Sequence, residues 1–246
     1  MRWMYHIGRY MRLLAKSFRK PEKFSVFKDL LVTELESIGL QSVGIVALLS
    51  IFMGAVICLQ TAHQIGGWIP IYTIGFTVRQ TMILEFSPTL IPVILAGKVG
   101  SNIASQIGTM RVTEQIDAMT TLSTDPFKYL VAPRVIAATM CMPVLALIAD
   151  IIGVMGGFVV GTQSFGFNAA IYVQQTVNFL QPDDVISGLI KAAVFGFIIA
   201  IMGCYHGYHS KGGAQGVGRA TTNAVVASSI LILAANYLMT SLLFSA

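Results

Sequence analysis

Long apolar stretches separated by short polar ones make up most of the chain, and this pattern predicts a bundle of membrane-spanning helices. Residues 37–78, 151–182, 192–210 and 220–246 contain no Asp, Glu, Lys or Arg. A helix needs about 20 apolar residues to cross the hydrocarbon core, so each run can hold one span. With the remaining apolar stretches, the pattern predicts five spans, at about residues 38–64, 77–107, 135–161, 185–205 and 222–244.

The first 36 residues have a different pattern. Apolar side chains recur there at helical spacing, and most of the basic side chains lie off that stripe. The stripe consists of Trp3, Ile7, Tyr10, Leu14 and Phe18. It is typical of a basic amphipathic helix that lies in the membrane interface; the alternative is a soluble helix packed on another domain. We therefore predict an interfacial region at residues 1–36 and one five-span domain at residues 37–246.

Composition and charge agree with a membrane protein. The chain is 55% hydrophobic and 11% charged, whereas a soluble domain has about 25% charged residues. Of the 16 Lys and Arg residues, eight precede residue 37, four lie in residues 98–134 and two in residues 205–219. The segment 161–184 has neither. The positive-inside rule therefore predicts a cytoplasmic N-terminus and an external C-terminus, so the net charge of +5 does not indicate nucleic-acid binding.

Small residues form two stripes at every fourth position. One runs through Ala96, Gly100, Ala104 and Gly108 of the second span. The other runs through Gly153, Gly157 and Gly161 of the third span. Stripes of this kind let neighbouring membrane helices approach closely.

A short polar segment, at about residues 110–119, separates the second and third spans. Val112, Ile116 and Met119 share one face of a predicted helix there. Four polar residues lie elsewhere on it: Arg111, Glu114, Gln115 and Asp117. A short amphipathic helix between two spans predicts a cytoplasmic surface that contacts a soluble partner.

Three ionisable residues are expected at membrane depth: Glu85, Asp150 and Lys191. Burying a charge in hydrocarbon is costly, so such residues are candidates for function. Glu85 and Lys191 lie at equal depth, roughly 10–12 Å below the outer ends of two descending helices. We predict that they form a pair or share a polar pocket, and a purely structural ion pair is the alternative. Asp150 either hydrogen-bonds a neighbouring helix or takes part in transport.

The sequence gives no support for catalysis by this chain. The glycine-rich segment 213–220 lacks the Lys-Ser/Thr of a phosphate-binding loop and precedes a span rather than following a strand. Cys58, Cys141 and Cys204 lie singly in apolar surroundings, which predicts inert packing. His206 and His209 have no carboxylate nearby in the sequence and are not expected to bind metal. We predict a protein that is not an enzyme and binds no cofactor itself.

Several long motifs resemble the MlaE/YrbE permease family. They are LAGKVGSNIASQIGTMRVTEQIDAM, DPFKYLVAPRVIA, GVMGGFVVG, IKAAVFGFIIAIMGCYHGY and GVGRATTNAVV, and they occur in the family's order over residues 38–246. The resemblance implies a homodimeric permease of an ABC transporter in the inner membrane. It also implies a cytoplasmic ATPase that binds ATP and magnesium, a periplasmic MCE-domain partner, and movement of phospholipid between the inner membrane and the periplasm.

The resemblance also implies roles for single residues. The segment with Arg111, Glu114, Gln115 and Asp117 resembles the coupling helix that is seated in the ATPase. Glu85 and Lys191 match an acidic and a basic residue near the lipid cavity. Leu84 stands where some members have an arginine, so Arg79 is a further candidate there. Trp68 is another, because it falls where some members have an aromatic residue at the cavity mouth. Two other function classes stay open: an ion-coupled secondary transporter that uses Glu85, Asp150 and Lys191, and a membrane scaffold without transport.

Overall fold

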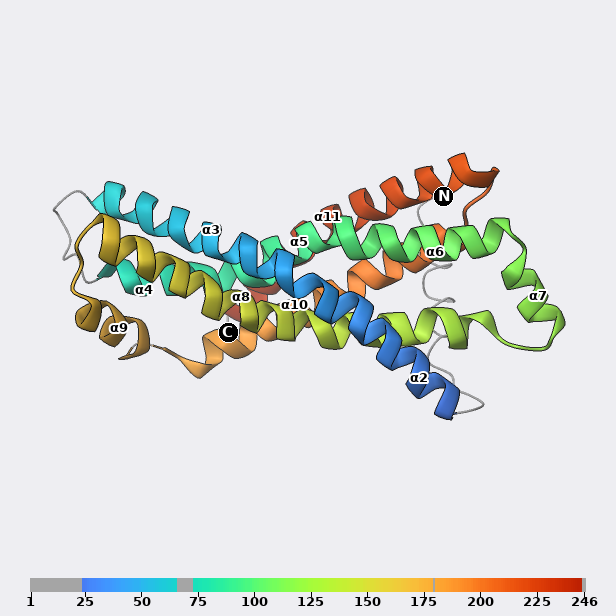
Figure 1. The fold of residues 1–246 in the computed structure, drawn as a ribbon, viewed down its shortest axis with the longest axis horizontal. Coiled ribbons are helices and arrows are strands. Elements are labelled where there is room, and N and C mark those ends of the chain that lie inside the picture. Colours follow the sequence, from blue (N-terminus) through green and yellow to red (C-terminus); the bar gives the residue numbers. More distant parts are fainter. Residues whose placement is uncertain (1–23, 66–72, 179, 245–246) are drawn as a thin grey trace.

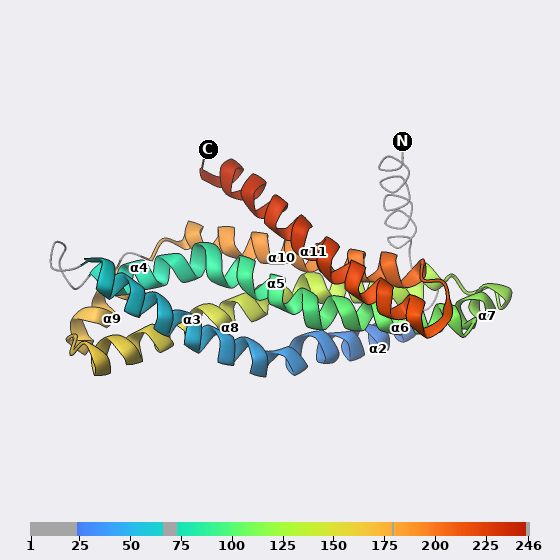
Figure 2. The same cartoon turned by 90° about the horizontal axis from the view of Figure 1, so that it is seen from above.

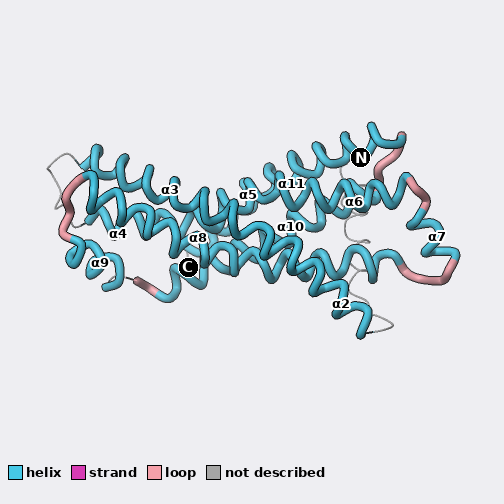
Figure 3. The backbone as a smooth tube through the Cα atoms, viewed as in Figure 1, coloured by secondary structure: helices cyan, strands magenta, loops and turns pink. Residues whose placement is uncertain are grey.

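The structure is a computed structural model that describes residues 24–65, 73–178 and 180–244 (Figure 1). All elements in these ranges are helices, joined by short loops (Figure 3). They are α2 (Phe24–Leu35), η1 (Glu36–Leu40), α3 (Gln41–Ile65), α4 (Thr73–Thr81), η2 (Met82–Leu90), α5 (Ile91–Leu95), η3 (Ala96–Gly100), α6 (Ser101–Val112), α7 (Gln115–Thr121), η4 (Phe127–Val131), α8 (Ala132–Ser164), α9 (Ala169–Asn178), α10 (Pro182–Tyr208) and α11 (Gly213–Phe244); the η elements are π-helical.

Five continuous helices are long and apolar enough to cross a membrane, which confirms the five-span prediction. They run over Val26–Gln64, Thr73–Val112, Phe127–Ser164, Pro182–Tyr208 and Gly213–Leu243. The first three of them combine several elements, because π-helical turns join α-helical segments without a break. The boundary predicted at residue 36 lies inside the first of these helices. Residues 1–23, with most of the predicted interfacial helix, lie outside the described residues.

The second glycine stripe packs α8 along α3. A Cβ atom on Gly54 of α3 would lie 1.7 Å from the carbonyl oxygen of Gly153, and one on Gly156 would lie 2.4 Å from that of Ile51. Both distances are far below van der Waals contact, so the helix backbones touch only because side chains are missing there. The two helices lie side by side in both orientations of the ribbon (Figures 1 and 2).

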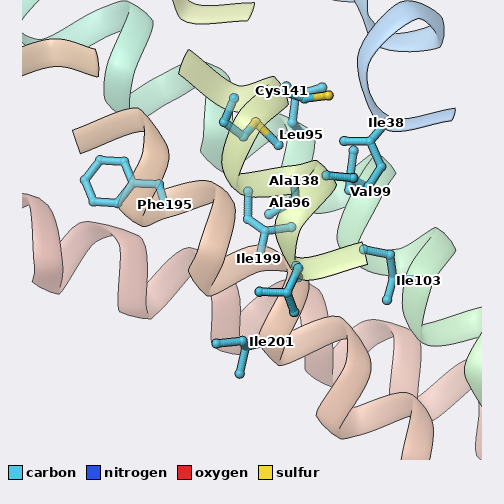
Figure 4. Close-up of a cluster of buried hydrophobic side chains, with 14 of the residues drawn as sticks. Ile38, Leu95, Ala96, Val99, Ile103, Ala138, Cys141, Phe195, Ile199 and Ile201 are labelled. Atoms are coloured by element: carbon cyan, nitrogen blue, oxygen red, sulfur yellow. The ribbon is translucent and has the colours of Figure 1, made fainter. Parts of the chain in front are cut away.

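The first stripe packs α6 against α10. Ala96 and Ala104 are fully buried, and a Cβ atom on Gly207 of α10 would lie 2.8 Å from the carbonyl oxygen of Ala104. Apolar side chains above this contact form one buried cluster, drawn in Figure 4, that includes Phe195 and Ile199 of α10. The close packing predicted from both stripes is therefore confirmed.

The structure corrects the predicted cytoplasmic helix at residues 110–119. Helix α6 continues to Val112, a turn follows, and the separate helix α7 begins only at Gln115. The break lies at Glu114, whose φ of 60° is left-handed and cannot continue a right-handed helix. Of the predicted apolar face, Ile116 is fully buried, but Val112 is 37% exposed. We call residues 113–126, which contain α7 and its flanking turns, the elbow.

The boundaries of the fourth and fifth spans also differ from the sequence-based prediction. The interval between residues 205 and 222 is mostly helical, because α10 extends to Tyr208 and α11 begins at Gly213. A short helix, α9, lies between the third and fourth spans. Helix α11 crosses the bundle obliquely, and its C-terminal end stands away from the other helices (Figure 2). Many apolar side chains on that end are exposed, among them Tyr237 at 75% and Leu242 at 71%.

Candidate functional site: a polar cluster between three spans

Lys191 is the centre of a polar cluster inside the helix bundle. Its side chain is 1% exposed, although it comes from the middle of the apolar helix α10. An ammonium group has three N–H donors, and the structure provides three acceptors. They are Glu85 Oε1 at 3.3 Å, the carbonyl oxygen of Leu84 at 3.1 Å and Thr240 Oγ1 at 2.8 Å. The buried charge is therefore both paired and fully hydrogen-bonded.

Helix α11 completes the cluster around Glu85. Asn236 Nδ2 donates to Glu85 Oε2 over 3.0 Å, and Thr240 Oγ1 lies 3.5 Å from Glu85 Oε1. Asn236 Oδ1 in turn accepts a hydrogen bond from Thr89 Oγ1 at 3.1 Å. The cluster therefore joins η2, α10 and α11. We call Glu85, Lys191, Asn236, Thr240 and Thr89 the polar cluster.

The irregular backbone of η2 contributes an acceptor to this cluster. Pro88 lies inside η2 and has no N–H group. It therefore cannot donate to a carbonyl four or five residues earlier, at Leu84 or Ile83. Lys191 donates to the carbonyl of Leu84. The carbonyl oxygen of Ile83 lies against Gly188 of α10, where a Cβ atom added to Gly188 would be only 2.8 Å away. π-Helical turns are frequent at functional sites because they free backbone groups in this way.

Burial is unequal within the ion pair. The Lys191 side chain is buried, whereas the Glu85 side chain is 43% exposed. A buried cation with a half-exposed counter-ion presents negative charge, with an amide and a hydroxyl beside it, at the surface of the bundle. The accessible side of the cluster is therefore acidic and hydrogen-bonding, while the positive charge of Lys191 is compensated inside the bundle.

The sequence left open whether Glu85 and Lys191 pair directly, and the structure shows that they do. It missed the partners on the fifth span. Asn236 and Thr240 are one helical turn apart in the mainly apolar C-terminal half of α11, so they face the same direction. That spacing was the available signal, but only the packing of α11 on η2 and α10 shows which charges they contact.

Arg79 lies near the end of the bundle that carries α9. Its side chain is buried at 2% exposure and donates to the carbonyl oxygen of Thr176 in α9 over 2.7 Å and to Gln80 Oε1 over 3.2 Å. Gln80 Nε2 donates to Asp184 Oδ2 at the start of α10. These bonds fasten α4 to α9 and α10. Trp68, the other predicted cavity residue, lies outside the described residues.

Asp150 lies on α8 beside Ser87 of η2. Asp150 Oδ1 and Ser87 Oγ are both buried and lie next to each other. Asp150 thus faces a neighbouring helix, and both sequence-based alternatives, a hydrogen bond to that helix and a role in transport, stay predictions. Its neighbour Ser87 is two residues from Glu85 in η2, but no bond links Asp150 to the polar cluster among the described residues.

The four polar residues predicted for partner contact lie at the elbow. Glu114, Gln115 and Asp117 are exposed, and Arg111 at the end of α6 forms an ion pair with Asp117 at 2.5 Å. The guanidinium of Arg111 also lies 5.7 Å from the ring centroid of Tyr208 at the end of α10. These contacts tie the elbow to two spans while leaving its polar surface open.

Five membrane-length helices and a charged cluster buried among three of them define an integral membrane protein of the transporter class. A model of the family described as Permease MlaE matches residues 31–242. The chain belongs to this family, whose relatives are named as permeases of ABC transporters.

Individual relatives agree with this assignment. The chain is 53% identical over 219 residues to a probable ABC transporter permease protein of Rickettsia prowazekii (strain Madrid E), covering 89% of this chain and 85% of that protein. It is 30% identical over 220 residues to the intermembrane phospholipid transport system permease protein MlaE of Haemophilus influenzae, covering 88% and 84%. It is 34% identical over 211 residues to the chloroplastic protein trigalactosyldiacylglycerol 1 of Arabidopsis thaliana, covering 86% and 60%.

Proposed function

We propose that this permease moves phospholipid between the inner membrane and a periplasmic MCE-domain carrier. In this proposal the chain works as a homodimer with a cytoplasmic ATPase, which binds ATP and magnesium and supplies the energy. The N-terminus and the elbow lie in the cytoplasm, and the C-terminus lies in the periplasm. The name of the Haemophilus relative as a phospholipid transport permease supports the substrate class.

The polar cluster is the observation that carries the proposal. It combines a cation, a carboxylate and an amide inside an apolar bundle. A phospholipid needs apolar walls for its tails and a few polar groups for its headgroup. The half-exposed Glu85 is an acceptor for a cationic headgroup amine, and the second amide N–H of Asn236 is a donor for the phosphate. Lys191, whose three donors are used within the cluster, holds Glu85 in place. The exposed apolar side chains of α11 lie on the helix that also carries Asn236 and Thr240.

The mechanism needs no nucleotide chemistry in this chain. Nucleotide binding closes the partner ATPases, and the elbow, seated in them, moves with them. The glycine-lined contact between α3 and α8 has smooth backbone surfaces that can slide past one another. The resulting rearrangement changes the environment of the polar cluster between a lipid-binding and a lipid-releasing state.

The test is lipid movement by the purified complex in proteoliposomes. We expect phospholipid to copurify with the complex and to move only when the partner ATPase hydrolyses ATP. A matched complex with a catalytically inactive ATPase should move no phospholipid. Movement that follows an imposed ion gradient without ATP would instead identify a secondary transporter. Normal cell-surface lipid composition after loss of all three of Glu85, Asp150 and Lys191 would favour a scaffold.

A further inference from the structure

Two basic residues hold the first span on either side of its π-helical turn, and they come from the two helices that support the elbow. The leading arm, η3 with α6, enters the elbow, and the trailing arm, α8, leaves it through η4. The first span runs without a break through α2, η1 and α3. Each arm therefore contributes one cation to a span that is not connected to the elbow in sequence.

The contact on the α2 side of η1, called the lower contact below, is made by Arg134 of the trailing arm. This side chain is 5% exposed. Its Nε donates to Glu34 Oε1 of α2 over 2.8 Å, and its Nη2 donates to Gln106 Oε1 of α6 over 2.8 Å. One guanidinium thus joins the first span to both arms. The planar fork of arginine suits this role, because its donors point to two acceptors in fixed directions.

The contact on the α3 side of η1, called the upper contact below, is made by Lys98 of the leading arm. Its ammonium group donates to the carbonyl oxygen of Gln41 and lies 3.3 Å from Ser42 Oγ, at the start of α3. Ser42 is fully buried. The two contacts to the first span are therefore at residue 34 and at residues 41 and 42.

The π-helical turn η1 occupies the interval between these contacts. It is packed rather than loose: Ile38 is 3% exposed and belongs to the buried cluster that contains Val99 of the leading arm (Figure 4). Cys141 of the trailing arm lies against Gly39, whose ideal Cβ position is 2.9 Å from the Cys141 sulfur. A π-helical turn has a shifted hydrogen-bond register, so the helix can change direction there at lower cost than in a regular α-helix.

We propose that Arg134 and Lys98 are positioning residues that carry the movement of the elbow to the first span, with η1 as the hinge between their two contacts. The inference rests on the proposed function, since it needs a partner that moves the elbow. When the two arms move relative to one another, Arg134 displaces α2 and Lys98 displaces the start of α3, so the span bends at η1 between them. Because α3 packs along α8 through glycines, a small rotation at the hinge repositions the whole outer half of the first span.

The decisive variants remove these contacts without leaving a buried unpaired charge. Arg134→Met combined with Glu34→Gln removes both charges of the lower contact, and Lys98→Met removes the upper one. The matched control for the lower contact is Arg219→Met combined with Asp29→Asn, both exposed in the structure, and Lys211→Met, also exposed, is the control for the upper contact. The complex with its ATPase is purified and reconstituted, and ATP hydrolysis and lipid movement are measured on the same vesicles.

We expect both decisive variants to assemble and hydrolyse ATP within about twofold of wild type but to move at least about fivefold less lipid per ATP, the lower end of typical coupling between sites. The controls should match wild type. A ratio of lipid to ATP within about twofold of wild type in both decisive variants would overturn the inference. If Arg134→Met alone fails to assemble but the combined variant assembles, the assembly defect comes from the unpaired charge of Glu34 and not from loss of the contact.

A second readout does not depend on lipid. Spin labels are placed at Thr121 in the elbow and at Leu48 of α3, both exposed. In the wild-type complex we expect the distance between them to change when ATP binds an inactive ATPase, and in the decisive variants we expect less than half of that change. If wild type moves no lipid but the variants abolish the distance change, the proposed function fails while this inference stands. An unchanged distance shift in the variants would refute the inference.

Discussion

Lys191 Nζ lies 3.3 Å from Glu85 Oε1, although 106 positions separate the two residues in the chain. The pair is asymmetric, because the lysine side chain is 1% exposed and the glutamate side chain is 43% exposed. The carboxylate lies at the surface of the bundle, whereas the ammonium group is enclosed by it. This difference determines how the two residues should respond to substitution.

Glu85→Ala should destabilise the protein more than Lys191→Met. The first change leaves a buried ammonium without its counter-ion, at a cost of about 3 kcal/mol. The second leaves a half-exposed carboxylate that still accepts hydrogen bonds from Asn236 and Thr240, so its cost is smaller. Thermal unfolding in detergent measures both. The double variant should lose less than the sum of the single losses, because the two groups interact directly. Strictly additive losses would show that the pair contributes no direct interaction.

Asn236→Ala should reduce the amount of phospholipid that copurifies with the complex. The change removes the donor to Glu85 Oε2 and the acceptor for Thr89, at about 1–2 kcal/mol for the lost hydrogen bonds. Asn223→Ala is the matched control, since Asn223 is exposed on the same helix. Mass spectrometry of bound lipid compares the two variants. Equal lipid content in both would remove α11 from the proposed lipid site.

Glu114→Lys combined with Asp117→Lys should release the partner ATPase or uncouple its hydrolysis from lipid movement. Both side chains are exposed at the elbow, and Asp117 also loses its ion pair with Arg111. We expect about a tenfold loss of copurified ATPase, which corresponds to about 1.4 kcal/mol of binding free energy. Asp29→Lys, an exposed charge reversal on α2, should have no effect. Normal assembly and coupled transport in the elbow variant would place the ATPase contact elsewhere.

Gly54→Ala should strongly reduce folding yield. The added methyl group would lie 1.7 Å from the carbonyl oxygen of Gly153, so α3 and α8 must separate. Overpacking of this kind costs typically 1–3 kcal/mol, and backbone contact on both sides puts this site at the upper end. Gly44→Ala on the same helix has no atom within 4 Å of the new carbon and is the control. Equal thermal midpoints for the two variants would contradict the observed helix contact.

Single-cysteine labelling in intact cells should reach Gln174→Cys but not Lys211→Cys. Gln174 is exposed on α9, in a segment without basic residues, whereas Lys211 is exposed in the loop between α10 and α11. The positive-inside rule assigns these segments to opposite sides. The three native cysteines are buried, so background labelling should be low. The reverse labelling pattern would invert the predicted orientation of the protein.

The sequence by itself determined the number of spans, the close-packing faces and the candidate charges. Spans follow from composition over about 20 residues, and the glycine stripes follow from a spacing of four. Both are local properties of the chain.

Only the tertiary structure decided which polar groups meet. Glu85, Lys191 and Asn236 lie on three different helices, and their contacts depend on how α11 and η2 are rotated about α10. Arg134 and Glu34, likewise, are 100 positions apart. The register shifts at the π-helical turns change the direction of every side chain that follows, and a pattern based on 3.6 residues per turn does not contain them. The break at Glu114 is likewise absent from that pattern, because a single left-handed residue divides a segment whose polar pattern is continuous.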